Sequence, residues 1–256
     1  MGKPKFVIHT PTDIVGIREA ARRAAECLDR ICRAVRPGMS TQELDRFAGK
    51  VISELGCTSA FLDYHGFPAN ICISMNDEVV HGIGHHRRVI KMGDIVSIDC
   101  GVHYGGFVGD NARTVAVGPP SRQAQRLMEV TKASLMAGIE AAQGGNSVRD
   151  IGRAVESTVT AAGYTVVEEF VGHGVGKELH EPPEVPNYPT RKGNVKLHPG
   201  MVLAIEPMVN IGTAKVTIAD DGWTVNTEDG ALSAHFEHMV LITNNKPEIL
   251  TWLKTQ

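Results

Sequence analysis

The chain has 256 residues, of which 42% are hydrophobic, enough for one large domain or for two fused halves with a sizeable core. Its formal net charge of −3 gives no general attraction to nucleic acid or to a membrane surface, so neither is expected as a specific partner. No apolar run approaches about 18 residues and no signal-peptide pattern is present, which indicates a cytoplasmic protein. The five cysteines form no Cys-x-x-Cys pair, which argues against a disulfide framework and a thiolate zinc site.

Two pairs of helices are predicted, one in each half of the chain. Apolar residues recur at steps of three and four in the first helix, and Thr12 or Asp13 is its expected N-cap. Ser40 and Glu43 form a capping box for the second helix, and Ser147 opens the fourth. The predicted helical ranges are 12–35, 40–55, 121–142 and 147–162.

A segment of the chain occurs twice, 107 residues apart, and each copy ends in a carboxylate. GDIVSID (93–99) ends in Asp99, and GMVLAIE (200–206) ends in Glu206. The same offset aligns RPGMSTQELDRF (36–47) with QGGNSVRDIGRA (143–154). A gapless offset across two elements predicts two halves related by a pseudo-twofold axis, with Asp99 and Glu206 facing each other across it.

Each helix pair precedes a β-rich region, without strict βαβ alternation. This order predicts an α+β fold in which paired helices cover one side of antiparallel sheets. We expect a single domain over residues 1–256, with halves at about 11–118 and 119–250. The predicted β-rich regions are 69–75, 94–117, 165–171, 201–210 and 235–242.

Residues 94–117 read as a β-hairpin that brings two acids together. A two-residue turn at Tyr104-Gly105 would place Asp99 directly opposite Asp110 on one face of the sheet. Like charges in this position repel and destabilise the hairpin unless something neutralises them.

Four carboxylates lie in apolar β contexts, those of Asp99, Asp110, Glu206 and Glu237, the last in a predicted terminal strand. Gathered in one core, they require cations. With the glycine-flanked His173 they form a donor set of oxygens and one nitrogen, which suits Co²⁺, Mn²⁺, Fe²⁺, Zn²⁺ or Ni²⁺. Two such ions sharing bridging carboxylates would suit a hydrolytic reaction. Taken singly, each acid or histidine is more often a surface or satisfied core residue.

At this point the chain resembles the type I methionine aminopeptidases, a metallopeptidase family with the pita-bread fold. The resemblance extends from the first helix to residue 250. It is carried by HGI at 81–83, IDCG…GDNARTV at 98–115, GHGVGKELHEPP at 172–183, GMVLAIEPM at 200–208 and FEH at 236–238.

The resemblance implies a dinuclear metal centre with five protein ligands. In it, Asp110 and Glu237 would bridge the two ions, Asp99 would complete one ion, and His173 with Glu206 would complete the other. Glu206 would also be the catalytic base, while His81 and His180 would contact the substrate without binding metal.

The resemblance further implies removal of the initiator methionine from nascent chains whose second residue is small. Tyr64, Phe67, Cys72 and Trp223 match positions that hold the methionine side chain, although core packing explains Tyr64 and Phe67 equally well. Phe67 often appears as Tyr in relatives, and Leu179 as Phe, which concerns the shape of the pocket.

The implied partner is the N-terminus of a nascent polypeptide, and a monomer is expected. Transient ribosome association would use basic residues of the first helix, although a solvated helix face explains them as well. Those residues are Arg18, Arg22, Arg23, Arg30 and Arg33.

Four other classes of protein fit the sequence less well. Type II relatives carry a helical insertion between the two glutamates, for which the spacing of Glu206 and Glu237 leaves too little room. Proline-directed peptidases of the same fold usually carry a large N-terminal domain, which is not expected here. Non-catalytic scaffolds of this fold lose metal ligands, whereas all five are present. A purely structural protein does not account for the clustered acids.

Overall fold

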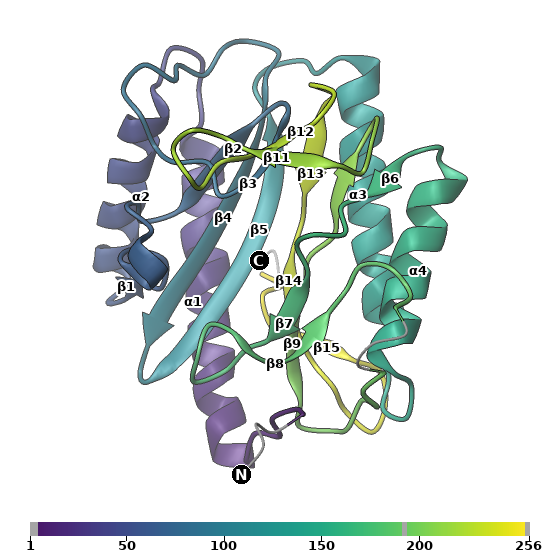
Figure 1. Ribbon diagram of the computed structural model, residues 1–256. Helices are drawn as coiled ribbons and strands as arrows, with labels where there is room; N and C mark the ends of the chain where they lie inside the picture. The colour runs from purple at the N-terminus through teal and green to yellow at the C-terminus, as the bar shows by residue number, and fades with distance from the viewer. Residues whose placement is uncertain (1–4, 191–193, 254–256) are drawn as a thin grey trace.

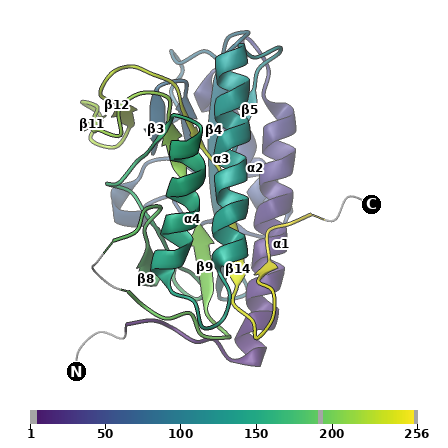
Figure 2. The same cartoon turned by 90° about the vertical axis from the view of Figure 1, so that its right-hand side faces the viewer.

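The computed structural model describes residues 5–190 and 194–253, and within them it has four α-helices packed on one side of antiparallel sheets (Figures 1 and 2). The predicted α+β class is therefore confirmed. The helices are α1 (Pro11–Ala34), α2 (Thr41–Glu54), α3 (Arg122–Ala141) and α4 (Val148–Ala161). Among the described residues, no helix is long and apolar enough to cross a membrane.

Strand β4 is the centre of the first half, where β5 pairs with one of its edges and β1 and β2 pair with the other. The elements of this half are β1 (Thr58–Ser59), the 3-10 helix η1 (Tyr64–Gly66), β2 (Cys72–Met75), β3 (Glu78–Val80), β4 (Ile95–Tyr104) and β5 (Phe107–Ala116).

The second half contains a five-stranded sheet in the order β15-β14-β9-β7-β8 and a three-stranded sheet in the order β13-β10-β6. Strand β12 pairs with β11 on one edge and with β3 of the first half on the other, so a second three-stranded sheet joins the halves. The strands are β6 (Thr165–Val166), β7 (Gly172–Gly174), β8 (Glu181–Val185), β9 (Val202–Ile205), β10 (Met208–Asn210), β11 (Val216–Ile218), β12 (Val225–Thr227), β13 (Ser233–His235), β14 (His238–Leu241) and β15 (Glu248–Ile249).

The offset of 107 residues is found in the positions of the secondary-structure elements as well as in the amino-acid sequence. Helices α2 and α4 begin and end 107 residues apart, and so do β1 and β6. An isolated bridge joins Ser40 to Val89 in the first half, and its counterpart joins Ser147 to Lys196 in the second. The two halves are therefore related by the predicted pseudo-twofold axis.

The helix starts follow the predicted capping chemistry with one correction. Ser40 and Ser147 cap α2 and α4. The N-cap of α1 is Thr10, not Thr12 or Asp13; Asp13 is the third helical residue, and its carboxylate accepts the Thr10 backbone N–H at 3.1 Å. The reason is Pro11, which occupies the first helical position, where a missing N–H costs nothing.

The turn of the β4–β5 hairpin is Gly105-Gly106, one residue later than predicted. Both glycines have positive φ, as a tight two-residue hairpin turn requires, whereas Tyr104 pairs with Phe107 inside the ladder. Consequently Asp99 lies opposite Ala112, not opposite Asp110. The two acids are diagonal neighbours, and they still share one face of the sheet.

Glu206 and Glu237 lie in two-residue breaks between strands, not within strands as predicted. Ile205 pairs with His238 and Met208 pairs with His235, so the breaks face each other where the chain passes from one sheet to the next. The Glu237 N–H donates instead to the carbonyl of Ala112 in β5 at 3.0 Å. The predicted strand at 165–171 is likewise reduced to the short β6.

Close packing of α1 on β5 places the first helix beside the hairpin acids. A Cβ atom at Gly109 would overlap the backbone carbonyl of Ala20 in α1, so this position tolerates only glycine without movement of the helix. The cluster between α1 and the sheets includes Ile17, Ala21 and Val108, all fully buried.

We predict that Gly109→Ala lowers the free energy of unfolding by about 1–3 kcal/mol, because two backbone segments must separate. Gly16→Ala is the matched control, since the atoms nearest its added Cβ belong to the half-buried ring of Phe107, a side chain that can move more easily than backbone, and alanine favours a helix interior. Urea unfolding of both variants measures the difference. An equal effect of the two substitutions would contradict the proposed helix–strand contact.

Candidate active site

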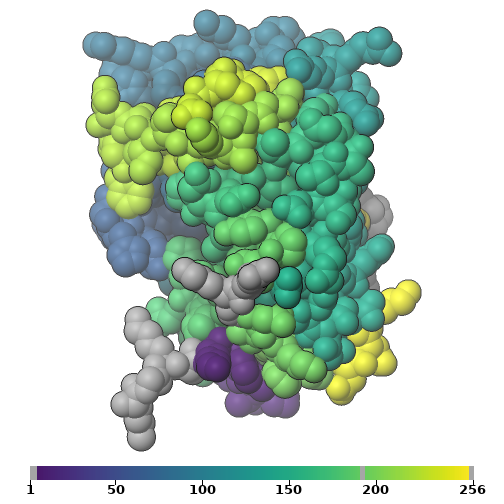
Figure 3. Space-filling view, turned by 45° about the vertical axis from the view of Figure 1, so that its right-hand side comes forward, coloured from purple at the N-terminus to yellow at the C-terminus, as the bar shows by residue number. Residues whose placement is uncertain are grey.

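One cavity of about 360 Å³ opens between the two halves. Its mouth is visible as a hollow bordered by the segment near residue 64 and by the segment near residue 223 (Figure 3). The cavity wall contains every residue that the sequence analysis proposed for metal or substrate: Tyr64, Phe67, Cys72, His81, Asp99, Asp110, His173, His180, Glu206, Trp223 and Glu237.

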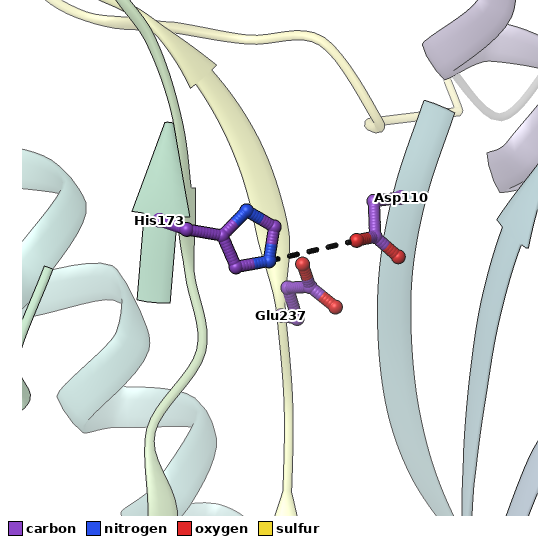
Figure 4. Close-up of side chains that lie close together, drawn as sticks. All are labelled: Asp110, His173 and Glu237. Atoms are coloured by element: carbon purple, nitrogen blue, oxygen red, sulfur yellow. Dashed lines mark ion pairs between the residues drawn. The ribbon is translucent and has the colours of Figure 1, made fainter. Parts of the chain in front are cut away.

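Asp110, His173 and Glu237 form the tightest group in this cavity. They come from β5, from β7 and from the break before β14, and one ligand atom of each lies within 4.8 Å of the others (Figure 4). His173 Nε2 is 3.8 Å from Asp110 Oδ2 and 3.4 Å from Glu206 Oε1. Asp99 and Glu206 lie outside the tightest group but line the same wall.

Burial makes the carboxylates of this wall difficult to ionise together. It raises the pKa of Asp110 to about 7. Burial also raises the pKa of Asp99, Glu206 and Glu237 well above the usual range, and neighbouring carboxylates add to the effect. Without a cation, the group therefore holds protons at neutral pH.

The imidazole of His173 is prepared to act as a lone-pair donor. Its Nδ1 lies 3.0 Å from the carbonyl oxygen of Gly174, which can only accept, so Nδ1 carries the proton and Nε2 is free. Burial, with a smaller contribution from His180, lowers the pKa of His173 to about 3. Its short contacts with Asp110 and Glu206 are therefore not salt bridges, because the ring is neutral.

The donor set fits a divalent metal ion. Oxygen atoms of Asp99, Asp110 and Glu237 are buried without a hydrogen-bond partner, an arrangement that is costly unless a cation compensates it. Carboxylate oxygens with one imidazole nitrogen are ligands for hard to borderline divalent ions. We therefore expect the cost of burying these acids to be recovered by metal binding.

His81 and His180 lie at the rim of the same cavity. His81 has a positive φ of 60°, a strained conformation for a non-glycine residue, and its ring packs edge-on against Phe170. His180 Nδ1 is 2.7 Å from the hydroxyl of Tyr64. Burial, with a smaller contribution from His180, lowers the pKa of His81 to about 4. Burial and His65 lower the pKa of His180, so both rings are neutral near pH 7.

The other end of the cavity is apolar and aromatic. Phe67 and Trp223 pack edge-to-face with ring centroids 5.2 Å apart. Cys72 lies directly opposite Asp99 in the β2–β4 ladder, and burial keeps its thiol neutral by raising its pKa. This end offers a thioether or alkyl side chain a dry surface with aromatic contacts.

Sequence reasoning missed several residues of this cavity. Phe61 and Phe170 line it, and no motif marks either one. His235 is buried behind the wall, and its Nε2 lies 3.6 Å from Glu206 Oε2 without a hydrogen-bond partner. Its place two residues before Glu237 was the only signal in the sequence.

Buried acids, one neutral imidazole with a free nitrogen and an adjoining apolar pocket are the features of a metal-dependent hydrolase site. The model of metallopeptidase family M24 matches residues 15–244, so the chain belongs to this family and uses divalent metal.

Relatives and solved structures agree with this assignment. The chain is 47% identical to the methionine aminopeptidase of Clostridium acetobutylicum over 246 residues, covering 96% of this chain and 98% of the relative. It is 45% identical to the methionine aminopeptidase of Escherichia coli K12, covering 96% and 94%. The crystal structure of methionine aminopeptidase from Rickettsia prowazekii superposes with a TM-score of 0.93 at 38% identity, covering 96% of this chain and all of that one.

We predict that the metal-free protein loses stability as the pH rises above about 7, because the buried histidines are then neutral in both the folded and the unfolded chain and the buried acids dominate the titration. The raised carboxyl pKa values mean that these acids stay protonated when folded but ionise when unfolded, so their contribution is present below the unfolded pKa and is lost as the pH rises. Added Mn²⁺ at about 100 times its Kd should restore about 2.7 kcal/mol.

Thermal unfolding with and without Mn²⁺ measures both effects. Asp110→Asn is the informative variant, because it removes one buried charge and one ligand. It should melt higher than wild type without metal near pH 8, and it should gain less from Mn²⁺. A wild-type melting temperature that does not respond to any divalent ion would refute the metal interpretation.

Proposed function

We propose that the chain is a methionine aminopeptidase that removes the N-terminal methionine from nascent proteins and peptides whose second residue is small. The main support is a single cavity that contains both a cluster of buried carboxylate oxygens without hydrogen-bond partners and an aromatic pocket. The methionine aminopeptidases to which the chain is 45–47% identical support this assignment.

The proposed centre holds two divalent ions in a single metallopeptidase domain, at the junction of its two halves. Asp110 and Glu237, which belong to the tightest donor group, would be shared between the ions. Asp99 would complete the coordination of one ion. His173 and Glu206, whose ligand atoms are 3.4 Å apart, would complete the coordination of the other. The ions, when bound, would polarise the scissile carbonyl and lower the pKa of a water molecule toward neutrality.

The side chains around the centre would move the protons. Glu206 is the proposed base; its carboxylate would accept a proton from water and pass it to the leaving amine. Tyr64 donates to His180 Nδ1 in this proposal, which leaves Nε2–H free to donate to the substrate. The neutral rings of His81 and His180 would thus hold the scissile amide and stabilise the developing oxyanion.

The apolar end would hold the substrate methionine against Tyr64, Phe67, Cys72 and Trp223. Sulfur–aromatic contacts of this kind contribute about 0.3–1.5 kcal/mol each. A narrow space beside the metal centre would admit only a small second side chain.

The proposed partner is a nascent polypeptide in the cytoplasm, bound by a monomer. The arginines of α1 are better explained as a solvated face than as a ribosome-docking patch, because each of them forms an ion pair. The pairs are Arg18–Glu248, Arg22–Glu19, Arg23–Glu19, Arg30–Glu54 and Arg33–Asp29.

The function is tested by the rates of release of methionine from Met-Ala-Ser and Met-Leu-Ser. The narrow subsite predicts a loss of about 10²-fold or more in kcat/KM for Met-Leu-Ser, because a bulky second residue does not fit. Leu-Ala-Ser serves as the control for the methionine pocket. Equal rates on the two methionyl peptides, or no release from either, would overturn the proposal.

Variants of two histidines separate substrate contact from metal binding. We predict that His180→Ala keeps its metal and loses about 10²–10³-fold in kcat, with a smaller change in KM. His173→Ala should instead lose metal affinity first, and excess metal should partly restore its activity. Metal titration combined with steady-state kinetics distinguishes them. Rescue of His180→Ala by excess metal would show that the roles are assigned wrongly.

A further inference from the structure

The loop that carries His180 connects β7 to β8 and comprises residues 175–180. It is pinned to neighbouring strands near its start, since Val175 N–H donates to the Val202 carbonyl and the Gly176 carbonyl accepts from Val108 N–H. Its far end reaches the cavity, where His180 meets the Tyr64 hydroxyl. The placement of the His180 ring therefore depends on what holds this short loop in shape.

Glu181, the next residue, ties the loop together from within. Its Oε1 accepts the backbone N–H groups of Lys177 at 2.8 Å and Glu178 at 3.2 Å. Burial alone would raise the pKa of Glu181, but the adjacent His9 ring and the two backbone N–H groups outweigh burial and lower it. The carboxylate is thus ionised, and it fixes the loop directly beside His180.

His9 supplies the remaining partner of Glu181 from a distant part of the sequence. Its Nε2 lies 3.2 Å from Glu181 Oε2, in close contact but without hydrogen-bond geometry, and the two side chains are only 3% and 8% exposed. The ring also covers Gly176, where a Cβ atom would overlap it. His9 is itself fixed, because its N–H donates to the Gly200 carbonyl at 2.9 Å and Thr10 caps α1 directly after it.

The segment that carries His9 therefore packs against this loop. A second contact, between Asp13 and Lys177 at 2.9 Å, joins the first turn of α1 to the same loop. Lys177 is 59% exposed, so this pair is screened by water and holds the loop less firmly. The buried contact with His9 is the one that can set the position of the loop.

We infer that His9 is a positioning residue for the reaction, which acts through Glu181 to hold His180 toward the substrate. Tyr64 orients the His180 ring from the cavity side, and the His9–Glu181 pair fixes its backbone from the opposite side. A substrate donor must be held within a fraction of an ångström to act in the transition state, so loss of this support should reduce turnover. The inference rests on the proposed aminopeptidase function.

The test uses His9→Leu, which fills the space without donating, and His9→Gln, whose amide places an N–H close to the position of Nε2. With Mn²⁺ saturating and Met-Ala-Ser as substrate, His9→Leu should lose about 10-fold or more in kcat. Its KM and Mn²⁺ affinity should stay within about twofold, since no ligand or pocket side chain changes. His9→Gln should recover most of the lost kcat.

A double-mutant comparison shows whether His9 acts through His180. If it does, adding His9→Leu to His180→Ala should cause little further loss, whereas a general structural defect would lower kcat in both backgrounds alike. Thr10→Ala is the matched control, because it removes the α1 cap from the same segment while both His9 and Glu181 stay in place. It should lower the melting temperature and leave kcat unchanged.

If His9→Leu folds poorly, Glu181→Gln tests the same contact from its other side. It is also expected to lower kcat with little change in KM. Wild-type kcat in His9→Leu or in Glu181→Gln, additive losses with His180→Ala, or no recovery in His9→Gln would overturn the inference. An inactive wild-type enzyme would instead refute the proposed function, so the two failures are distinguishable.

Discussion

The constraint on which the structure depends is the burial of four carboxylates at the junction of its two halves. Carboxylates kept from water without partners are unstable as anions, and Asp99, Asp110, Glu206 and Glu237 all have raised pKa values for this reason. The fold nevertheless holds them together. The β4–β5 hairpin presents two on one face, and the paired strand breaks present the other two. Bound cations would compensate the cost of burying these four carboxylates together.

In the proposed function, the polar part of the cavity carries out the chemistry and the apolar part recognises the substrate side chain. The proposed metal-binding donors come from strands β4, β5 and β7 and from the facing strand breaks, with His173 held by the Gly174 carbonyl. His180, the proposed substrate contact, lies instead on a loop, and a loop needs support from elsewhere. We propose that the contact between His9 and Glu181 provides that support, which gives a role to two buried polar side chains outside the proposed ligand set.

Much of this arrangement could be predicted from sequence because it is local or repeated. Capping boxes at Ser40 and Ser147 involve residues three apart, and the offset of 107 residues needs only comparison of the chain with itself. The hairpin register was missed by one residue, because two adjacent glycines compete with Tyr104 for the turn. The breaks at Glu206 and Glu237 were missed because they are set by the change from one sheet to another. His9, Phe170 and His235 depend on tertiary packing, which no local pattern records.

The central claim is that metal bound by the buried acids makes this cavity catalytic. The most direct measurement is turnover of Met-Ala-Ser by metal-stripped protein titrated with single divalent ions, with bound metal counted at each step. The account predicts no turnover without metal and activity that rises with occupancy toward two ions per chain. Full turnover by the stripped protein, or saturating metal binding that persists when Asp110 and Glu237 are both replaced by amides, would contradict it.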